Sequence, residues 1–215
     1  ASSLGCCGYI ARSMRTSVLE TVAGMERLLQ AERLRRQAVA LKLGPVDLHR
    51  LAPDLVAQAG RAAEGKGLRV KSDVPPGAAA HSDRELITLA LQNLLGNAVK
   101  YSGNREPAEI EVTCRALEGG GHEFTVRDNG AGFDMQYAGK LFGVFQRLHS
   151  PSEFPGTGVG LASVRRVLGR HGGQIRAEAV PGQGATFHFT LPAPGEVGSH
   201  QGSRSHEQAP HEQAP

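Results

Sequence analysis

The sequence predicts an α+β fold: a two-layer α/β sandwich with helices on one face of a mixed sheet, preceded by a long α-helix. Three observations lead to this fold class. Apolar residues recur at helical steps before Pro45. Between Pro45 and Pro194, helical and strand-like segments follow one another in unequal runs. Two pairs of alternating segments, each joined by a glycine-containing turn, are typical of β-hairpins.

Length and composition are those of one ordinary globular domain. The 215 residues are 40% hydrophobic and 21% charged, and the net charge of +3 is dispersed. An aromatic content of 5% argues against a nucleic-acid surface, and Arg33–Arg36 is expected to be a solvated helix face. No apolar run reaches the roughly 18–20 residues of a membrane helix. Three cysteines without metal-ligand spacing (Cys6, Cys7 and Cys114) fit reduced thiols in a cytoplasmic protein.

Residues 1–44 are expected to form one long helix that ends at Gly44-Pro45. Its apolar stripe needs a partner, because a single helix cannot bury such a stripe by itself. Packing within the chain and dimerisation with a second copy both satisfy this need. The stripe consists of Ile10, Met14, Val18, Val22, Met25 and Leu29, and it resumes at Leu34, Ala38 and Leu41.

Residues 45–194 are expected to form the mixed domain, and 195–215 a disordered tail. The tail is rich in Gly, Ser, His, Gln and Glu, and it contains HEQAP twice. Within the domain, Ser82–Glu85 matches a capping box that opens a helix running to about Tyr101. The other expected elements are helices Asp47–Gly65 and Val159–His171, strand Leu68–Val74, and hairpins Ala108–Leu117/His122–Asp128 and Gln174–Val180/Ala185–Leu191.

The segment DNGAGF (Asp128–Phe133) follows a predicted strand, so that Asp128 stands where its carboxylate can project into a pocket. A carboxylate there can accept a hydrogen bond from the exocyclic amine that separates adenine from guanine. Gly130 and Gly132 allow backbone geometry that a Cβ would block. An isolated Asp-Asn-Gly is commonly only a turn, and it is the spacing to the neighbouring segments that favours a pocket.

On the helix after Ser82, four residues share one face: Asn93, Asn97, Lys100 and Tyr101. Asn97 carries an amide oxygen, a hard ligand suited to Mg²⁺, and Lys100 supplies a point charge for phosphate oxygens.

The segment GTGVGL (Gly156, Thr157, Gly158, Val159, Gly160 and Leu161) opens the next predicted helix, and its backbone N–H groups can receive phosphate. It follows the polar segment Gln146–Pro155, which is suited to act as a lid. Phe142 and Phe145 are spaced to anchor this lid in the core, and Arg147 at its root could reach a terminal phosphate. Neither a Walker loop nor a Rossmann turn is present.

Four segments in this order, NLLGNAVKY, DNGAGF, KLFGVFQRL and GTGVGL, resemble the N, G1, F and G2 boxes of the sensor histidine kinase ATP-binding domain. That domain belongs to the gyrase, heat-shock chaperone, kinase and mismatch-repair (GHKL) superfamily, and the resemblance covers roughly Pro45–Pro192. It implies the Bergerat ATP-binding fold. GQGATF resembles the family's late glycine-threonine segment, which would put Thr186 beside Asp128 and the adenine. KLFGVFQRLH and SEFPGTGVGL are similar to kinases coupled to PAS or phytochrome-type domains.

The resemblance implies a site for ATP and Mg²⁺. Asp128 would select adenine, Asn93 and Asn97 would hold Mg²⁺, and Lys100, Arg147 and the Gly156–Gly160 backbone would hold phosphates. Lys100 and Arg147 are the candidate catalytic residues. The implied partners are an upstream sensory domain, a response regulator receiver domain and, through the N-terminal helix, a second copy of the chain; neither nucleic acid nor a membrane is expected.

The residue type at Asn93 helps to decide between phosphotransfer and hydrolysis. The hydrolases of the superfamily carry a Glu four residues before the magnesium Asn, whereas Asn93 stands at that position here. An amide cannot act as a general base near neutral pH, so the sequence favours transfer to a histidine over attack by water.

The phosphoacceptor is not evident. The first of the nine histidines is His49, beyond the long helix. The segment around Arg12 weakly resembles the family's histidine box, but Arg12 stands at the position of the histidine. We therefore expect an ATP-binding part that phosphorylates a histidine outside this chain. The alternatives are a non-catalytic nucleotide-binding regulator and, less favoured by Asn93, an ATP hydrolase.

Overall fold

The structure is a computed structural model that describes residues 40–62, 67–150, 153–154 and 156–193. The predicted tail, and the long helix up to residue 39, lie outside these ranges. The predicted end of the long helix at Gly44-Pro45 is wrong: residues 40–42 have no regular structure, and strand β1 (Leu43–Asp47) includes Gly44 and Pro45.

The main sheet has five strands in the order β2-β4-β5-β7-β6. These are β2 (Leu68–Asp73), β4 (Ala108–Ala116), β5 (His122–Asp128), β7 (Gly184–Leu191) and β6 (Ile175–Val180). β2 and β4 pair in parallel and the other neighbours are antiparallel, so the sheet is mixed and both predicted hairpins are confirmed.

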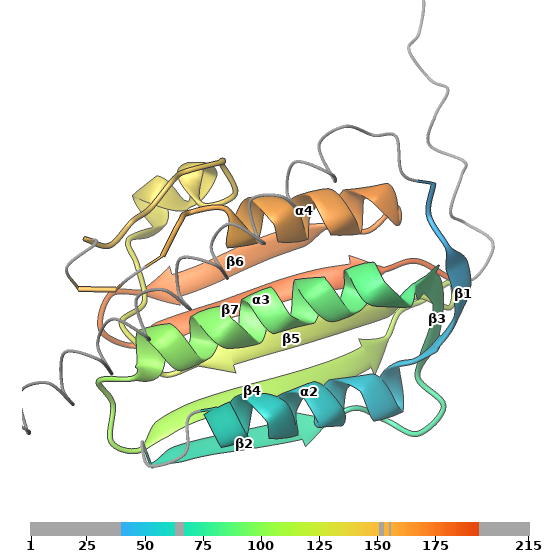
Figure 1. Cartoon of the computed structure of the whole chain (residues 1–215), viewed down its shortest axis with the longest axis horizontal. Helices are drawn as coiled ribbons and strands as arrows, with labels where there is room; N and C mark the ends of the chain where they lie inside the picture. The colour runs from blue at the N-terminus through green and yellow to red at the C-terminus, as the bar shows by residue number, and fades with distance from the viewer. Residues whose placement is uncertain (1–39, 63–66, 151–152, 155, 194–215) are drawn as a thin grey trace, which may run out of the picture.

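Helices α2 (Leu48–Ala62), α3 (Arg84–Ser102) and α4 (Gly160–Arg170) lie on one face of this sheet (Figure 1). The two-layer α/β sandwich is therefore confirmed. A short 3₁₀ helix, η1 (Met135–Lys140), follows the DNGAGF segment and was not predicted. None of the helices in the described ranges is long and apolar enough to cross a membrane.

A second sheet of two strands, β1 and β3 (Ala79–Asp83), was also missed. The alanine-rich β3 has no alternation of apolar and polar residues that would have predicted it. The strand also changes the helix cap. Ser82 lies in β3, opposite Gly44, while Asp83 is the N-cap of α3 and accepts hydrogen bonds from the backbone N–H groups of Glu85 (3.1 Å) and Leu86 (3.3 Å).

The core lies between helices and sheet. Leu91 and Leu94 of α3 are almost inaccessible, as are Phe124 and Phe189, whose rings stack at 5.0 Å. Burying each such side chain contributes about 1.5–3 kcal/mol. At the end of α4, His171 accepts a hydrogen bond at Nε2 from the Asp83 N–H (3.0 Å) and donates from Nδ1 to the Val167 carbonyl (2.8 Å). Burial lowers the pKa of His171, so the neutral ring holds the end of α4 against the start of α3.

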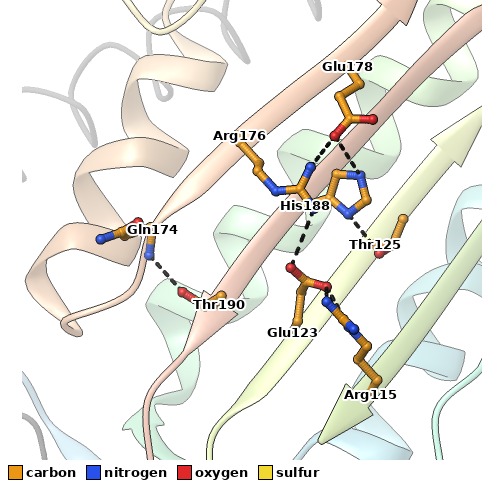
Figure 2. A network of polar contacts seen from close by, with 8 residues as sticks. All are labelled: Arg115, Glu123, Thr125, Gln174, Arg176, Glu178, His188 and Thr190. Carbon is orange, nitrogen blue, oxygen red and sulfur yellow. Dashed lines mark hydrogen bonds and ion pairs between the residues drawn. The ribbon is translucent and has the colours of Figure 1, made fainter. Parts of the chain in front are cut away.

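The opposite face of the sheet carries a polar network (Figure 2). Glu123 of β5 is the most enclosed acid there: its side chain is 11% exposed and lies 2.6 Å from the Arg115 guanidinium and 3.7 Å from that of Arg176. Arg176 also pairs with Glu178, which lies 3.8 Å from His188, and the His188 ring contacts Thr125 at 3.2 Å. Charged side chains thus cover a face on which no described helix packs (Figure 1).

Two acids on this face, Glu123 and Glu109, differ in burial and in the number of arginines they face, and they provide a comparative test. Glu123→Gln removes the charge that faces two arginines, and we expect it to lower the free energy of unfolding by about 1 kcal/mol. Glu109→Gln breaks the exposed pair with Arg69, whose side chains are 70% and 55% exposed, and should change stability by less than about 0.5 kcal/mol. Urea unfolding of the two variants measures both; equal losses would contradict the role given to burial.

Candidate functional site

Asp128 ends β5 with its side chain turned toward the helical layer, and it is only 5% exposed. Its Oδ1 accepts hydrogen bonds from the backbone N–H groups of Gly130 (2.9 Å) and Ala185 (3.3 Å). Burial raises the pKa of Asp128 to about 6, although these two hydrogen bonds act in the opposite direction. Both donors bond the same oxygen, so Oδ2 is the atom of this carboxylate placed to accept from a ligand.

The turn after Asp128 passes through a space that only glycine fits. A Cβ at Gly130 would lie 2.5 Å from the Tyr101 carbonyl oxygen, and one at Gly132, where φ is +59°, would overlap the Val180 carbonyl. The Ala131 N–H donates to Tyr101 (3.0 Å), and the Ala131 carbonyl accepts from the Gly182 N–H (2.7 Å). The turn is thereby bonded to the end of α3 on one side and to the β6–β7 turn on the other.

Asn93, Asn97, Lys100 and Tyr101 are all half-buried on α3, as their shared face predicts. The Asn93 amide donates from Nδ2 to the Leu89 carbonyl (2.9 Å), which leaves its Oδ1 facing the start of α4, 2.9 Å from where a Cβ of Gly160 would stand. The Lys100 ammonium lies 3.3 Å from where a Cβ of Gly156 would stand and 4.1 Å from the Tyr101 ring centroid. The fold therefore brings this face of α3 against the glycine-rich GTGVGL segment.

The GTGVGL segment leads into α4, which begins at Gly160, one residue later than predicted. Val159 is buried at the N-cap, and its apolar side chain offers no acceptor to the first N–H groups of the helix. Gly158 has φ +71°, and its carbonyl accepts from the Phe145 N–H (3.0 Å). Thr157 is exposed and Leu161 is half-buried against the core. A helix start with an apolar N-cap residue supports the expectation of an anion site.

The predicted anchoring of the lid is wrong for one of its two phenylalanines. Phe145 is 66% exposed, with φ +62°, and Phe142 is only half-buried. Phe154 is the buried anchor instead, with 5% exposure and its ring 4.9 Å from that of Tyr101. A spacing of three residues in KLFGVFQRL suggested a buried pair, but there η1 gives way to non-helical turns that expose Phe145.

Arg147 holds the backbone of the lid. Its guanidinium donates to the carbonyl of Gly156 (2.7 Å) and to that of Phe154. A contact with a terminal phosphate would require it to exchange these carbonyls for phosphate oxygens, so that role stays a prediction.

Thr186 does not lie beside Asp128, and this prediction is corrected. In the β5–β7 ladder Asp128 pairs with Ala185, while Thr186 pairs with Arg127. Because successive side chains of a strand point to opposite faces, Thr186 belongs to the polar face of the sheet, away from the helices. Ala185 contributes its backbone N–H as a hydrogen-bond donor, and its apolar side chain gave no indication of this role.

Arg105 is a second residue that the sequence did not single out. It donates to the carbonyls of Gly130 (3.3 Å) and Gly182 and so connects the DNGAGF turn with the β6–β7 turn. No cluster of three or more His, Cys, Asp or Glu in the described part of the chain could hold a metal ion. Mg²⁺ binding by the Asn93 and Asn97 amides stays a prediction.

Comparisons with known proteins identify the family. Residues 82–195 match the family model described as histidine kinase-, DNA gyrase B- and HSP90-like ATPase. Cyanobacterial phytochrome A of Nostoc sp. is 43% identical over 48% of this chain and 13% of the relative. The methanogenesis regulatory histidine kinase FilI of Methanothrix harundinacea is 48% identical over 52% of this chain and 12% of the relative. The chain therefore matches only about an eighth of either relative.

A solved structure, full-length ShkA in complex with AMPPNP, superposes with a TM-score of 0.74 at 28% identity. The superposition covers 86% of this chain and 38% of that one.

The glycine requirement of the turn can be tested by Gly132→Ala. Because a Cβ there meets the Val180 carbonyl and φ is positive, we expect a loss of at least about 2 kcal/mol in unfolding free energy. Gly139→Ala in η1 is the matched control, since a Cβ there meets nothing within 4 Å, and it should change stability by less than about 0.5 kcal/mol. Thermal or urea unfolding compares the two, and a tolerated Gly132→Ala would contradict the tight turn.

The Asp128 pKa of about 6 predicts how adenine nucleotide binding depends on pH. Only the ionised carboxylate accepts the exocyclic amine fully, so protons compete with the ligand as the pH falls through 6. Between pH 7 and pH 5 we expect the dissociation constant of the wild type to rise about tenfold more than that of Asp128→Asn. Calorimetric titration gives the dissociation constants of both proteins at each pH. Their ratio is independent of the titration of the nucleotide phosphates, because this affects both proteins alike. A pH-independent ratio would contradict the role of the carboxylate.

Proposed function

Because the chain belongs to the family of histidine kinase-, DNA gyrase B- and HSP90-like ATPases, we propose that it is the ATP-binding catalytic domain of a two-component sensor histidine kinase. The observation that carries the proposal is the buried Asp128 carboxylate, which faces a glycine turn that is bonded to the end of α3. A relative named as a histidine kinase, and the AMPPNP complex of ShkA, support the same choice.

Asp128 would recognise the base of the nucleotide. Its Oδ2 would accept the exocyclic amine of adenine, while Oδ1 stays bonded to Gly130 and Ala185. Guanine presents a carbonyl oxygen at the corresponding edge, and this oxygen would face the carboxylate without a proton between them. The domain would therefore prefer ATP to GTP.

The phosphates would lie between α3 and the start of α4. Lys100 stands next to Gly156 and would supply positive charge, while the first N–H groups of α4 would donate from the other side. Arg147 would join them after leaving the carbonyls of Phe154 and Gly156. These groups would act chiefly by positioning and by neutralising charge.

Mg²⁺ fits the chemistry of the donors on α3. The Asn93 amide already donates from Nδ2 to Leu89, so its oxygen is directed away from its own helix, and Asn97 follows one turn later. Amide oxygens combined with water and phosphate are an ordinary ligand set for this ion, which would neutralise charge on the transferred group.

Asn93 also supports transfer rather than hydrolysis, because an amide cannot take a proton from water near neutral pH. In the proposed reaction the bond between the γ-phosphorus and the bridging oxygen breaks. A bond forms from phosphorus to an imidazole nitrogen of a histidine outside this chain, ADP leaves, and the imidazole proton passes to solvent.

The proposed setting is a cytoplasmic signalling protein. An upstream sensory domain of PAS or phytochrome type is suggested by the relative named as a phytochrome, and a response regulator receiver domain would take the phosphoryl group. A homodimer would form through the apolar stripe of residues 10–41.

The experiment supplies the purified chain with Mg·ATP and a separately produced dimerisation hairpin of a related kinase. We expect label from γ-³²P-ATP on the hairpin, in a linkage stable to alkali and labile in acid. Label on the chain itself would contradict the external acceptor, and steady ATP turnover without an acceptor would indicate a hydrolase. ATP binding without transfer to any hairpin tried would favour the non-catalytic regulator.

The magnesium ligands have their own test. Asn97→Ala should weaken Mg·ATP binding at least about tenfold, because the ion would lose a ligand. Gln92→Ala is the control, since Gln92 is exposed on the same helix and should leave binding unchanged. Titration with and without Mg²⁺ separates loss of the ion from damage to the fold; equal affinities for the two variants would remove Asn97 from the site.

A further inference from the structure

His149 has no role in the functions proposed so far, yet it contacts two parts of the site at once. Its Nε2 lies 2.9 Å from the Gly132 carbonyl oxygen, which can only accept, so the imidazole donates this hydrogen bond. Its ring centroid lies 5.2 Å from that of Tyr101 and 5.2 Å from that of Phe154. Tyr101 and Phe154 also contact each other at 4.9 Å, so the three rings form one aromatic cluster.

The partners of His149 are the backbone supports of the nucleotide site. Gly132 belongs to the turn whose Gly130 donates to Asp128, and the Tyr101 carbonyl accepts from Ala131 in that same turn. Phe154 stands two residues before Gly156, and its carbonyl accepts from Arg147. His149 thus connects the chain that carries Arg147 with the turn that positions Asp128.

Among the described residues beside His149, Leu148 is half-buried against the core, whereas two other apolar neighbours are exposed. Val144 and Phe145 are 57% and 66% exposed, so they contribute little apolar burial that could offset the cost of ordering the backbone there. Phe154 and the half-buried His149 are the side chains from this region that enter the aromatic cluster. Removing His149 would therefore remove both a hydrogen bond and an aromatic contact of the segment.

We propose that His149 is a positioning residue of the nucleotide site. It holds the chain around Arg147 against Tyr101 and Gly132 before the nucleotide binds, so that part of the ordering cost is already met in the free protein. This inference rests on the proposed nucleotide-binding function. His149 acts through Gly132 and Tyr101 and need not touch the nucleotide, so its substitution should change the order of the chain around it as well as the affinity.

Three substitutions separate the two contacts. His149→Ala removes both, His149→Phe keeps a ring without the donor, and His149→Gln keeps a donor without the ring. We expect His149→Ala to speed amide hydrogen exchange in peptides spanning residues 143–150 of the nucleotide-free chain and to raise the ATP dissociation constant about three- to tenfold. The Phe and Gln variants should each recover part of both effects. His81→Ala is the matched control, because His81 is exposed in β3 of the small sheet.

The readouts separate the failure of this inference from failure of the proposed function. Wild-type exchange and affinity in the His149→Ala variant, with ATP bound by both, would overturn the role of His149 and leave the proposed function intact. If the wild type binds no ATP, the proposed function fails, while the exchange measurement still tests whether His149 holds the segment. A general rise of exchange that includes α3 would show a merely structural role and would also overturn the proposal.

Discussion

The site depends on one tight backbone contact, in which the DNGAGF turn passes between the end of α3 and the β6–β7 turn. The Tyr101 carbonyl accepts from Ala131 on one side, and Ala131 accepts from Gly182 on the other. There is no room for a Cβ at Gly130 or Gly132, so the turn cannot move outward without losing these bonds. Asp128 can be a buried acceptor only because its neighbour's backbone is held in this way. His149 extends the same constraint to the chain that carries Arg147, since it bonds to Gly132 within the turn.

Charge is distributed unequally over the two faces of the sheet. On the helical face the Asp128 carboxylate is nearly enclosed, and burial raises its pKa toward neutrality. On the other face acidic and basic side chains alternate and pair with each other, as Glu123 does with Arg115 and Arg176. A carboxylate without a cationic partner in a buried position is costly, and such costs are typical of binding sites.

Several predictions failed where a local pattern had two readings that only packing could separate. Ser82 and Asp83 are both good N-caps, and the pairing of Ser82 with Gly44 in the small sheet left Asp83 as the cap. Thr186 and Ala185 differ by one position in a strand, and a one-residue difference in register reverses the face that a side chain occupies. Phe145 was predicted to anchor the lid, but Phe154 does so, because its ring packs against those of Tyr101 and His149. β3 had no signal, since this short alanine-rich strand lacks alternation, and Gly44-Pro45 in β1 predicted the end of a helix rather than a strand.

The sequence alone determined the order along the chain of the three helices and of the five strands of the main sheet, because both follow from local spacing. Alternation and turn residues define the two hairpins, a 3.6-residue period defines α3, and glycine marks the turns that need its freedom. The tertiary structure decided which backbone atoms serve the site: the Ala185 N–H, the Tyr101 carbonyl and the Gly132 carbonyl. Every residue except proline carries the same backbone N–H and C=O groups, so the residue type does not reveal their role. Only the approach of segments far apart in the chain gives such atoms their partners.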